Sequence, residues 1–406
     1  MNQCSVISIH PGRQHNLEQA AQLAKRVKDF KHVTTLYFEE KTVSRWSKFS
    51  KKIGRALKKR SGILDKKYVD TKPIFELRLI LQRDILHNIS PTYYRRRNYL
   101  FQQWVINKYA PPKICIGFDT SSWLLFEKWK NKSFLILDLS IAVPQYKLHL
   151  AKEYGQDEEF VKRQTQDDNS EKYKIYEKEL GLADLILCGS DFVRQSCLSI
   201  GIDPAKLMLL PYGADLIKFH IKKQYKLDNK LVKIAFVGAF GYRKGADIIL
   251  KAWQYVIQKY PFVQLHIYGG VQIEVHPEIK GVFLHGFIMQ DLLVEELSNS
   301  DISILPTFFE GSSLAVYQSM AMGLPVVTTA NAGSIIQDQK NGVIIPYGSV
   351  QYLIEALELL ITKPLLRRKL GLQAQQDIMN YSWDDYGNKL RLIIEKAISS
   401  NVVKMQ

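Results

Sequence analysis

A single carboxylate, Glu310, follows an apolar run that predicts a buried strand, DISILPT (301–307). The next residue, Gly311, permits a tight turn, and Ser312 or Ser313 suits the cap of a following helix. The first N–H groups of that helix have no partner inside it and attract an anion. An anion would repel Glu310, so we expect this carboxylate to face a neutral, hydroxyl-rich group such as a sugar.

A second anion-binding turn is predicted after another apolar run, KIAFVG (233–238). Lys244 and Gly245 stand where a turn opens a helix, and Arg243 adds a further positive charge. Two such helix starts suit a ligand that carries a diphosphate. Gln318 lies about two helical turns beyond Glu310, roughly 12 Å along the axis, which suits a second hydroxyl group such as that of a ribose.

The elements that must position these residues are strands alternating with helices. Continuous apolar strands separated by helices are typical of parallel sheets covered on both faces. The expected strands fall in two series, 4–10, 33–39, 113–118, 133–140, 185–190 and 207–213, then 233–238, 263–269, 281–287, 301–307, 325–330 and 342–346. The sequence therefore predicts an α/β fold with two doubly wound, Rossmann-like domains.

The polar, lysine-rich stretch at 213–230 separates the two series and is the predicted linker. We predict a first domain at residues 1–212, completed by the C-terminal helix at 385–406, and a second domain at 213–384. Ligands of doubly wound sheets bind beyond the carboxyl ends of the strands, so two facing domains predict a site in the cleft between them.

Composition indicates a folded protein, with 46% hydrophobic and 24% charged residues. No apolar run has the roughly 18 to 20 residues that cross a membrane, and the N-terminus lacks the pattern of a signal peptide. The four cysteines show no CxxC spacing and are interpreted as free buried thiols. These features predict a cytoplasmic protein.

Positive charge is concentrated in the first quarter of the chain: residues 1–110 hold 23 Lys and Arg against 8 Asp and Glu, which accounts for nearly all of the net +16. Residues 45–60 form an amphipathic pattern with one apolar stripe and a basic far side. The stripe fits an anionic membrane surface, and it fits equally a helix docked on its own domain. Nucleic acid is a weaker alternative, because the aromatic residues do not interleave with the charges.

Several segments together resemble the large family of retaining glycosyltransferases with the GT-B fold, commonly called family 4. EGSSLAVYQSMAMGLPVV (310–327) resembles that family's E-x7-E segment, FVGAFGYRKGADIILKAW (236–253) its Lys-Gly donor loop, and GVFLHGFI (281–288) its base-contacting strand. ADLILCGSDFVRQSCLSIGIDPAKLMLLPYGADLIKF (183–219) resembles the segment that ends the first domain. The resemblance covers about residues 183–363.

The resemblance implies roles in binding a nucleotide-sugar donor. Lys244 and Arg243 would bind its diphosphate, Glu310 would contact hydroxyls of the transferred sugar, and Gln318 stands where a second glutamate binds the ribose. Further donor contacts are implied for the distal phosphate at Gly311, Ser312, Ser313 and Leu314, for the base at the backbone of Phe287 and Ile288, and for phosphate and acceptor at Gly12.

This sequence departs from the family at three places. Ala239 replaces an arginine, Gln318 replaces the second glutamate, and no histidine occurs between residues 133 and 148. In the strand expected at 133–140 Asp138 is the ionisable residue, so it is a candidate for contact with the acceptor or the sugar and equally for a buried structural carboxylate. His10 and His15 are further candidates for acceptor contact.

No D-x-D motif and no His/Cys ligand cluster is found in the sequence, so a diphosphate-bridging metal is not expected. No cofactor is expected beyond the nucleotide sugar as co-substrate. The resemblance implies transfer of a hexose with retention of configuration to a glycan or lipid-linked acceptor. Two alternatives remain open, a nucleotide-sugar hydrolase or epimerase on the same scaffold, and a catalytically silent binding protein.

Overall fold

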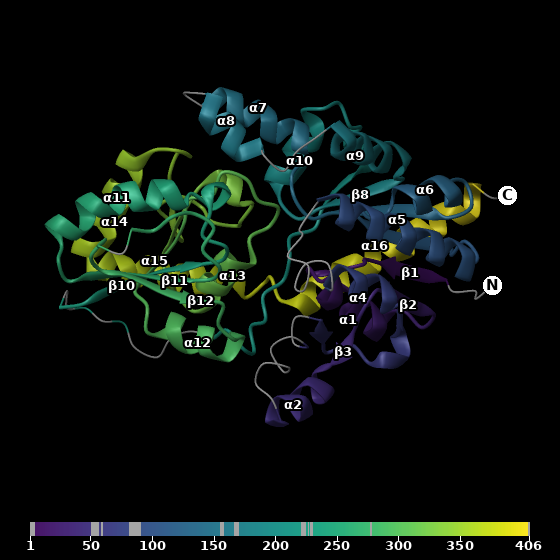
Figure 1. The fold of residues 1–406 in the computed structure, drawn as a ribbon, viewed down its shortest axis with the longest axis horizontal. Coiled ribbons are helices and arrows are strands. Elements are labelled where there is room, and N and C mark those ends of the chain that lie inside the picture. The colour runs from purple at the N-terminus through teal and green to yellow at the C-terminus, as the bar shows by residue number, and fades with distance from the viewer. Residues whose placement is uncertain are drawn as a thin grey trace.

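The computed structural model describes residues 5–49, 57, 60–80, 91–154, 158–165, 170–220, 225, 227, 230–276 and 278–404. Within these ranges the chain forms two lobes, each built around a parallel sheet (Figure 1). This architecture confirms the α/β class and the two Rossmann-like units predicted from the alternation of apolar strands and helices.

The first sheet has seven strands in the order β5-β2-β1-β6-β7-β8-β9, all parallel. Central strands such as β6 are buried at every position because helices cover both faces. The strands are β1 Val6–Ile9, β2 Phe30–Thr34, β5 Val69–Thr71, β6 Ile114–Phe118, β7 Phe134–Leu139, β8 Leu185–Cys188 and β9 Leu207–Leu209. A short separate pair joins β3 Phe38–Glu39 to β4 Ser61–Gly62.

The second sheet has six parallel strands in the order β12-β11-β10-β13-β14-β15. They are β10 Val232–Val237, β11 Val263–Tyr268, β12 Val282–Gly286, β13 Ile302–Leu305, β14 Val326–Thr328 and β15 Val343–Ile344. Because β10 pairs with β13, the loops that follow these two strands meet at the same edge of the sheet.

Helices of the first lobe are α1 Asn16–Arg26, α2 Glu40–Phe49, α4 Ile74–Ile80, α5 Pro91–Lys108, α6 Trp123–Trp129, α7 Pro144–Tyr154, α8 Glu158–Thr165, α9 Ser170–Leu182 and α10 Asp191–Leu198. Those of the second are α11 Ala246–Lys259, α12 Gln290–Ser298, α13 Leu314–Ala321, α14 Val350–Thr362 and α15 Pro364–Ile378. The last helix, α16 Trp383–Lys404, crosses back and packs against α1 (Figure 1).

Polar contacts hold α16 on the first lobe. Arg26 Nη2 lies 2.5 Å from Asp384 Oδ1, and Gln19 donates to the Tyr386 hydroxyl at 2.8 Å. The chain segments at Ala214 and Tyr381 run between the lobes. They are joined by a hydrogen bond in which the Ala214 N–H donates to the Tyr381 carbonyl at 2.8 Å.

The α7–α8 pair reaches over the second lobe (Figure 1). Gln164 on α8 donates to the Tyr347 hydroxyl at 3.1 Å, and the Phe160 ring packs on Phe308 at 5.8 Å between centroids. Phe308, Phe309 and Tyr347 of the second lobe thereby join the apolar cluster of the first. Burial of these rings, rather than the linker alone, fixes how the lobes face each other.

Most predicted strands are observed within one to four residues of their expected ends. The strand expected at 33–39 is displaced: β2 begins at Phe30 and ends at Thr34, and the short strand β3 forms at Phe38–Glu39. Between them the Thr35 side chain makes a buried polar contact with the Pro11 carbonyl. Strand β5 was not predicted. Cys115, Cys188 and Cys197 are buried free thiols, as expected, and Cys4 lies outside the described residues.

No helix among the described residues is long and apolar enough to cross a membrane. Residues 45–60, the predicted amphipathic stripe, lie largely outside the described ranges. Helix α2, which contains the start of that stripe, lies at the periphery of the first lobe, away from its sheet (Figure 1).

Candidate active site

The loop after β10 turns sharply and places two cations at the start of α11. Residues Tyr242–Lys244 form a short 3-10 turn, and Gly245 adopts a left-handed conformation with φ of 76°. A Cβ atom at Gly245 would lie 2.3 Å from the Pro306 carbonyl oxygen, so this turn requires glycine. The Lys244 side chain folds back over Gly238, where an added Cβ would stand 3.0 Å from its Nζ.

The loop after β13 is bonded directly to this turn. The Phe308 N–H donates to the Arg243 carbonyl at 2.8 Å, and Arg243 Nη1 donates to the Phe309 carbonyl at 2.6 Å. These bonds bring Glu310 against both cations: its Oε1 lies 2.8 Å from Arg243 Nη1 and 2.9 Å from Lys244 Nζ. The structure thus brings together the three charged residues that the sequence placed at two separate turns.

Glu310 is ionised at neutral pH. Burial alone would raise the pKa of this carboxyl group, but the charges of Lys244 and Arg243 outweigh it and lower the pKa to about 2. Its side chain is 14% exposed. An ionised carboxylate cannot donate a proton, so Glu310 can accept hydrogen bonds from hydroxyl groups and cannot serve as a general acid.

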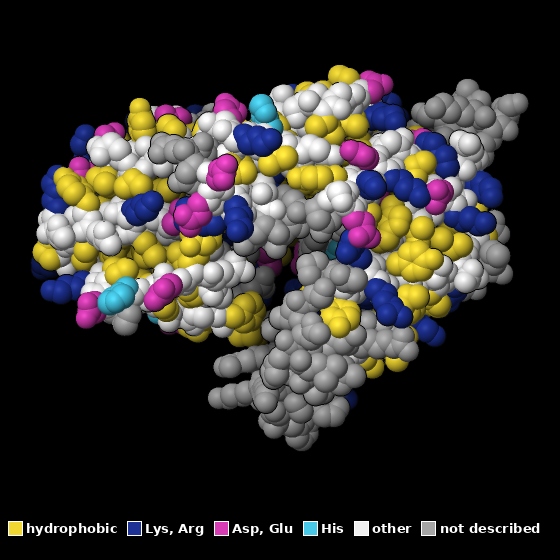
Figure 2. Space-filling model, turned by 45° about the horizontal axis from the view of Figure 1, so that its top comes forward, with side chains coloured by type: hydrophobic (Ala, Val, Ile, Leu, Met, Phe, Trp, Pro, Cys, Tyr) yellow, Lys and Arg dark blue, Asp and Glu magenta, His cyan; other side chains and the backbone are white. Residues whose placement is uncertain are grey.

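The start of α13 stands between the two lobes. Gly311 packs so closely on the first lobe that a Cβ atom would lie 1.9 Å from the Ser140 carbonyl oxygen, just after β7. The Ser190 hydroxyl, just after β8, donates to the Gly311 carbonyl at 2.5 Å. The carboxyl ends of the first sheet therefore face this loop, and Figure 2 shows a hollow between the two lobes.

Ser313 occupies the N-cap position of α13 but makes no side-chain capping bond, so the expected capping by a serine hydroxyl is wrong. The Ser312 hydroxyl instead contacts the Tyr317 hydroxyl at 3.2 Å. Both serines are buried. Leu314 is the first residue of α13, and an N–H group at that position has no partner inside the helix and suits an anion.

Gln318 lies on α13 and is partly exposed. No hydrogen bond of its side-chain amide occurs among the described residues. Phe287 and Ile288 follow β12 at the edge of the sheet, and the Phe287 side chain is 72% exposed. These positions are available to a ligand that extends from Glu310 along the second lobe.

Gly12 lies in the loop that follows β1, at the carboxyl edge of the first sheet. Its N–H donates to His10 Nδ1 at 3.1 Å, and Asn16 Nδ2 donates to its carbonyl at 3.3 Å. Burial lowers the pKa of His10 to about 3, so this imidazole is neutral at pH 7. The loop is thus a turn held by side-chain hydrogen bonds at the carboxyl edge of the first sheet.

Asp138 is buried near the end of β7, with 1% of its surface exposed. Its Oδ1 lies 3.0 Å from His15 Nε2, and its Oδ2 accepts from Gln19 at 2.5 Å. Both oxygens are engaged by α1 and the residue before it, which ties β7 to that helix. This geometry favours the structural alternative and does not favour direct contact of Asp138 with a ligand.

Two charged residues beside the Gly12 loop, Glu76 and Arg97, were not identified from sequence. A third, Arg60, was assigned only to the end of the basic stripe at 45–60, and the three are far apart in the chain. Among the described residues no group of three His, Cys, Asp or Glu side chains could hold a metal ion.

Residues 232–363, most of the second lobe, match the family model of glycosyl transferases group 1. An uncharacterized glycosyltransferase of Haemophilus influenzae is 30% identical over 185 residues, covering 43% of this chain and 49% of that protein. The amylovoran biosynthesis glycosyltransferase AmsK of Erwinia amylovora is 26% identical over 203 residues, covering 46% and 50%. The chain spans about half the length of these curated relatives.

Solved structures match nearly the whole chain. Sucrose-phosphate synthase from Thermosynechococcus elongatus and WaaG, a glycosyltransferase involved in lipopolysaccharide biosynthesis, each superpose with a TM-score of 0.66 at 15% identity, covering 97% and 96% of this chain and 99% of each neighbour. HepE of Anabaena, in complex with UDP and glucose, has a TM-score of 0.63 at 12% identity, covering 97% and 99%. These structural matches confirm the GT-B fold, and the family model and the curated relatives confirm the resemblance to glycosyltransferases.

Proposed function

We propose that this chain, whose second lobe matches the group 1 glycosyl transferases, moves a hexose from a nucleotide sugar to a glycan or lipid-linked acceptor. The observation that carries the proposal is the arrangement around Glu310. One ionised carboxylate and two cations meet beside the start of α13, where Gly311 contacts Ser140 and Ser190 of the first lobe. A diphosphate and a neutral sugar, joined in one ligand, suit those two kinds of group.

The cations would stabilise the leaving group. As the bond between sugar and diphosphate breaks, negative charge develops on the phosphate oxygens, and Lys244, Arg243 and the first N–H groups of α13 oppose it. The same cations now pair with Glu310, so an arriving diphosphate competes for them and leaves the carboxylate free to accept from sugar hydroxyls. No metal is needed for this charge balance in our proposal.

The stereochemistry proposed is retention. The acceptor hydroxyl would approach on the face from which the diphosphate departs, and a phosphate oxygen would take its proton. Glu310 is held ionised and Asp138 is buried against His15, so neither is poised as a free general acid. Asp138 is proposed to act as a positioning residue through His15.

The acceptor is proposed to belong to a surface polysaccharide or glycolipid. The names of AmsK and WaaG refer to such pathways, and the basic first 110 residues suit an anionic membrane surface. The protein should then co-sediment with vesicles of anionic phospholipid and dissociate as salt rises. Sedimentation indifferent to lipid charge would contradict a peripheral location on the inner membrane face.

Thermal unfolding against a panel of nucleoside diphosphates and nucleotide sugars tests the proposed function. A ligand at 100 times its Kd adds about 2.7 kcal/mol of stability, so a true donor raises the Tm clearly. Lys244→Ala should lose that shift, and Lys259→Ala, at an exposed position of α11, is the matched control.

Two outcomes would contradict the proposal. If no member of the panel raises the Tm, the site does not bind a nucleotide sugar. If the stabilising nucleotide sugar is consumed without transfer to any glycan or lipid-linked acceptor, the hydrolase alternative replaces the transferase.

A further inference from the structure

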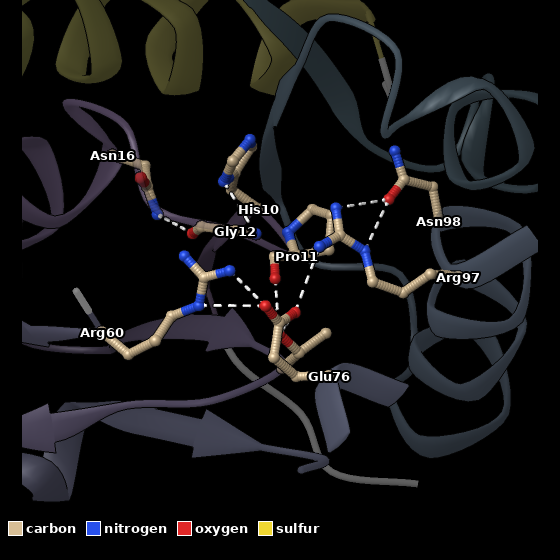
Figure 3. Close-up of polar contacts among 9 residues, drawn as sticks. His10, Pro11, Gly12, Asn16, Arg60, Glu76, Arg97 and Asn98 are labelled. Atoms are coloured by element: carbon tan, nitrogen blue, oxygen red, sulfur yellow. Dashed lines mark hydrogen bonds and ion pairs between the residues drawn. The ribbon is translucent and has the colours of Figure 1, made fainter. Parts of the chain in front are cut away.

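A second carboxylate held between two cations lies in the first lobe, beside the Gly12 loop (Figure 3). Glu76 on α4 is 1% exposed and pairs with two arginines. Arg97 Nη1 donates to its Oε2 at 3.1 Å, and Arg60 donates to its Oε1 through Nε at 3.1 Å and also through Nη2. Each carboxylate oxygen is thus paired with an arginine, and the Thr35 hydroxyl lies 3.0 Å from Oε2.

This cluster stands at the carboxyl edge of the first sheet. Thr35 follows β2 and contacts the Pro11 carbonyl at 2.5 Å, which joins the cluster to the loop after β1. The same sheet edge meets the second lobe at Ser140, after β7. Strand β7 is two places from β1, or about 10 Å at the usual strand spacing of roughly 4.8 Å. An acceptor that receives a sugar near Glu310 can therefore reach the arginines.

The cluster places two guanidinium groups at that edge. Both are always protonated, and Glu76 pairs with both of them, whereas His10 beside them is neutral because burial lowers its pKa to about 3. Arg97 donates three hydrogen bonds among the described residues, one to Glu76 and two to Asn98. A guanidinium has five N–H donors, so two remain for a ligand.

Exposure is consistent with this role. The side chain of Arg97 is 10% exposed and that of Arg60 is 23% exposed, whereas Glu76 is closed off. Figure 3 shows the two guanidinium groups on either side of the loop at Pro11 and Gly12. The excess of Lys and Arg over residues 1–110 adds a long-range field that attracts anions to the same lobe.

We propose that Arg97 and Arg60, oriented by the buried Glu76, form a subsite for an anionic oxygen group of the acceptor, a phosphate or a carboxylate. The acceptor class is then a phosphorylated or acidic glycan. This inference rests on the proposed transfer of a sugar at Glu310. It adds that the acceptor must carry an anionic group, which the first lobe binds.

Binding of two simple probes tests the subsite on the full chain. Inorganic phosphate and acetate are titrated into the wild type, Arg97→Gln, Lys244→Ala and the surface control Arg391→Gln, with calorimetric or NMR detection. Arg97→Gln removes charge-assisted hydrogen bonds, so we expect the affinity of this variant for the anionic probe to fall about tenfold or more. Lys244→Ala and Arg391→Gln should still bind the probe at the Arg97 subsite. Preference for phosphate or acetate identifies the group.

A conservative variant covers the case in which Arg97→Gln unfolds. Arg97→Lys keeps the charge beside Glu76 but loses the two-pronged geometry, so it should fold and bind the probe several-fold more weakly than wild type. Unchanged probe affinity in Arg97→Lys and Arg97→Gln would overturn the inference. So would loss of probe binding in Lys244→Ala alone, because the probe would then occupy the donor site.

Transfer kinetics separate this inference from the proposed function. With the nucleotide sugar found by thermal unfolding, matched acceptors with and without a phosphate or carboxylate are compared. Arg97→Lys should raise the KM for the anionic acceptor several-fold while the KM for the donor stays unchanged. Equal use of neutral and anionic acceptors by the wild type would overturn the subsite and leave the transferase intact; absence of any transfer would overturn the function itself.

Discussion

Two carboxylates lie between two cations at the sheet edges that face each other, and they are built differently. Glu310 in the second lobe engages both cations through one oxygen, Oε1, and its side chain is 14% exposed. Glu76 in the first lobe engages both oxygens and is 1% exposed. One carboxylate and two cations thus make one open arrangement and one closed arrangement.

The difference decides which group of each cluster, the carboxylate or a cation, is left to bind a ligand. In the open arrangement the carboxylate itself keeps an oxygen outside the ion pairs and can accept from a hydroxyl group. In the closed arrangement both oxygens of the carboxylate are buried and paired with arginines, and the spare hydrogen-bonding capacity belongs to the guanidinium of Arg97. Charge composition alone therefore does not decide whether a cluster recognises a neutral or an anionic group.

The largest expected effect on stability concerns the closed cluster. Glu76→Gln leaves two guanidinium groups without their carboxylate, and breaking a buried ion pair in this way costs about 3 to 5 kcal/mol. Urea unfolding should show this loss, whereas Glu395→Gln, in the exposed pair with Arg391, should change stability by less than about 1 kcal/mol. If Glu76→Gln and Glu395→Gln both lost only a little stability, the ion pairs of Glu76 would not be buried as we describe.

The open cluster should respond in activity instead. Glu310→Ala should reduce kcat/KM by about 10²- to 10³-fold, the scale of a lost polar contact to the reacting group. Its stability loss should be smaller than that of Glu76→Gln, because Arg243 is 39% exposed and can be rehydrated. Glu358→Ala, at the exposed pair with Lys259, is the control. Wild-type turnover in Glu310→Ala would remove this residue from the site.

Acid should affect the two lobes over different pH ranges. Burial lowers the pKa of His10 and of His32, both in the first lobe, to about 3. The unfolded chain takes up these protons near pH 6.5 and the folded chain does not, so stability falls as pH drops from about 6.5 toward 3, by about 1.4 kcal/mol per pH unit for each histidine.

The ionised Glu310 affects stability only in the lower part of this pH range. Its pKa is lowered from 4.5 to about 2, so its stabilising effect is complete above pH 4.5 and is lost only below that value. Unfolding free energies at pH 7, 6 and 5 check the sign for the histidines: His32→Gln should reduce the average slope by about 1 kcal/mol per pH unit, because the unfolded histidine is only partly protonated near pH 6.5. An unchanged slope would show that His32 titrates normally in the folded protein.

The smallest expected effect is at Gln318. A carboxylate accepts a stronger hydrogen bond from a ribose hydroxyl than an amide does, so Gln318→Glu should tighten donor binding by up to about tenfold with little change in kcat. Donor titration and steady-state kinetics measure the two quantities separately. A change in kcat with constant donor affinity would contradict the assignment of Gln318 to the ribose.

The second lobe could be predicted well from sequence because its site depends on local patterns. Lys244 and Glu310 each follow an apolar strand, and parallel strands place such residues at one edge. The Glu76 cluster could not be predicted, since its members come from a turn near β4, from α4 and from α5, and no periodicity links them. The end of β2 was missed for a related reason. Thr35 is β-branched and therefore favours a strand, but it lies beyond the end of β2, where its side chain makes a tertiary contact with Pro11.

The path of α16 has a consequence for the order in which the protein forms. This helix is synthesised after the whole second lobe, yet its Tyr386 is buried against Gln19 in the first lobe. During synthesis the second lobe therefore has all of its strands available before the first lobe has its final helix. We expect the N-terminal lobe to reach its native state last, the reverse of the usual order for a two-domain chain.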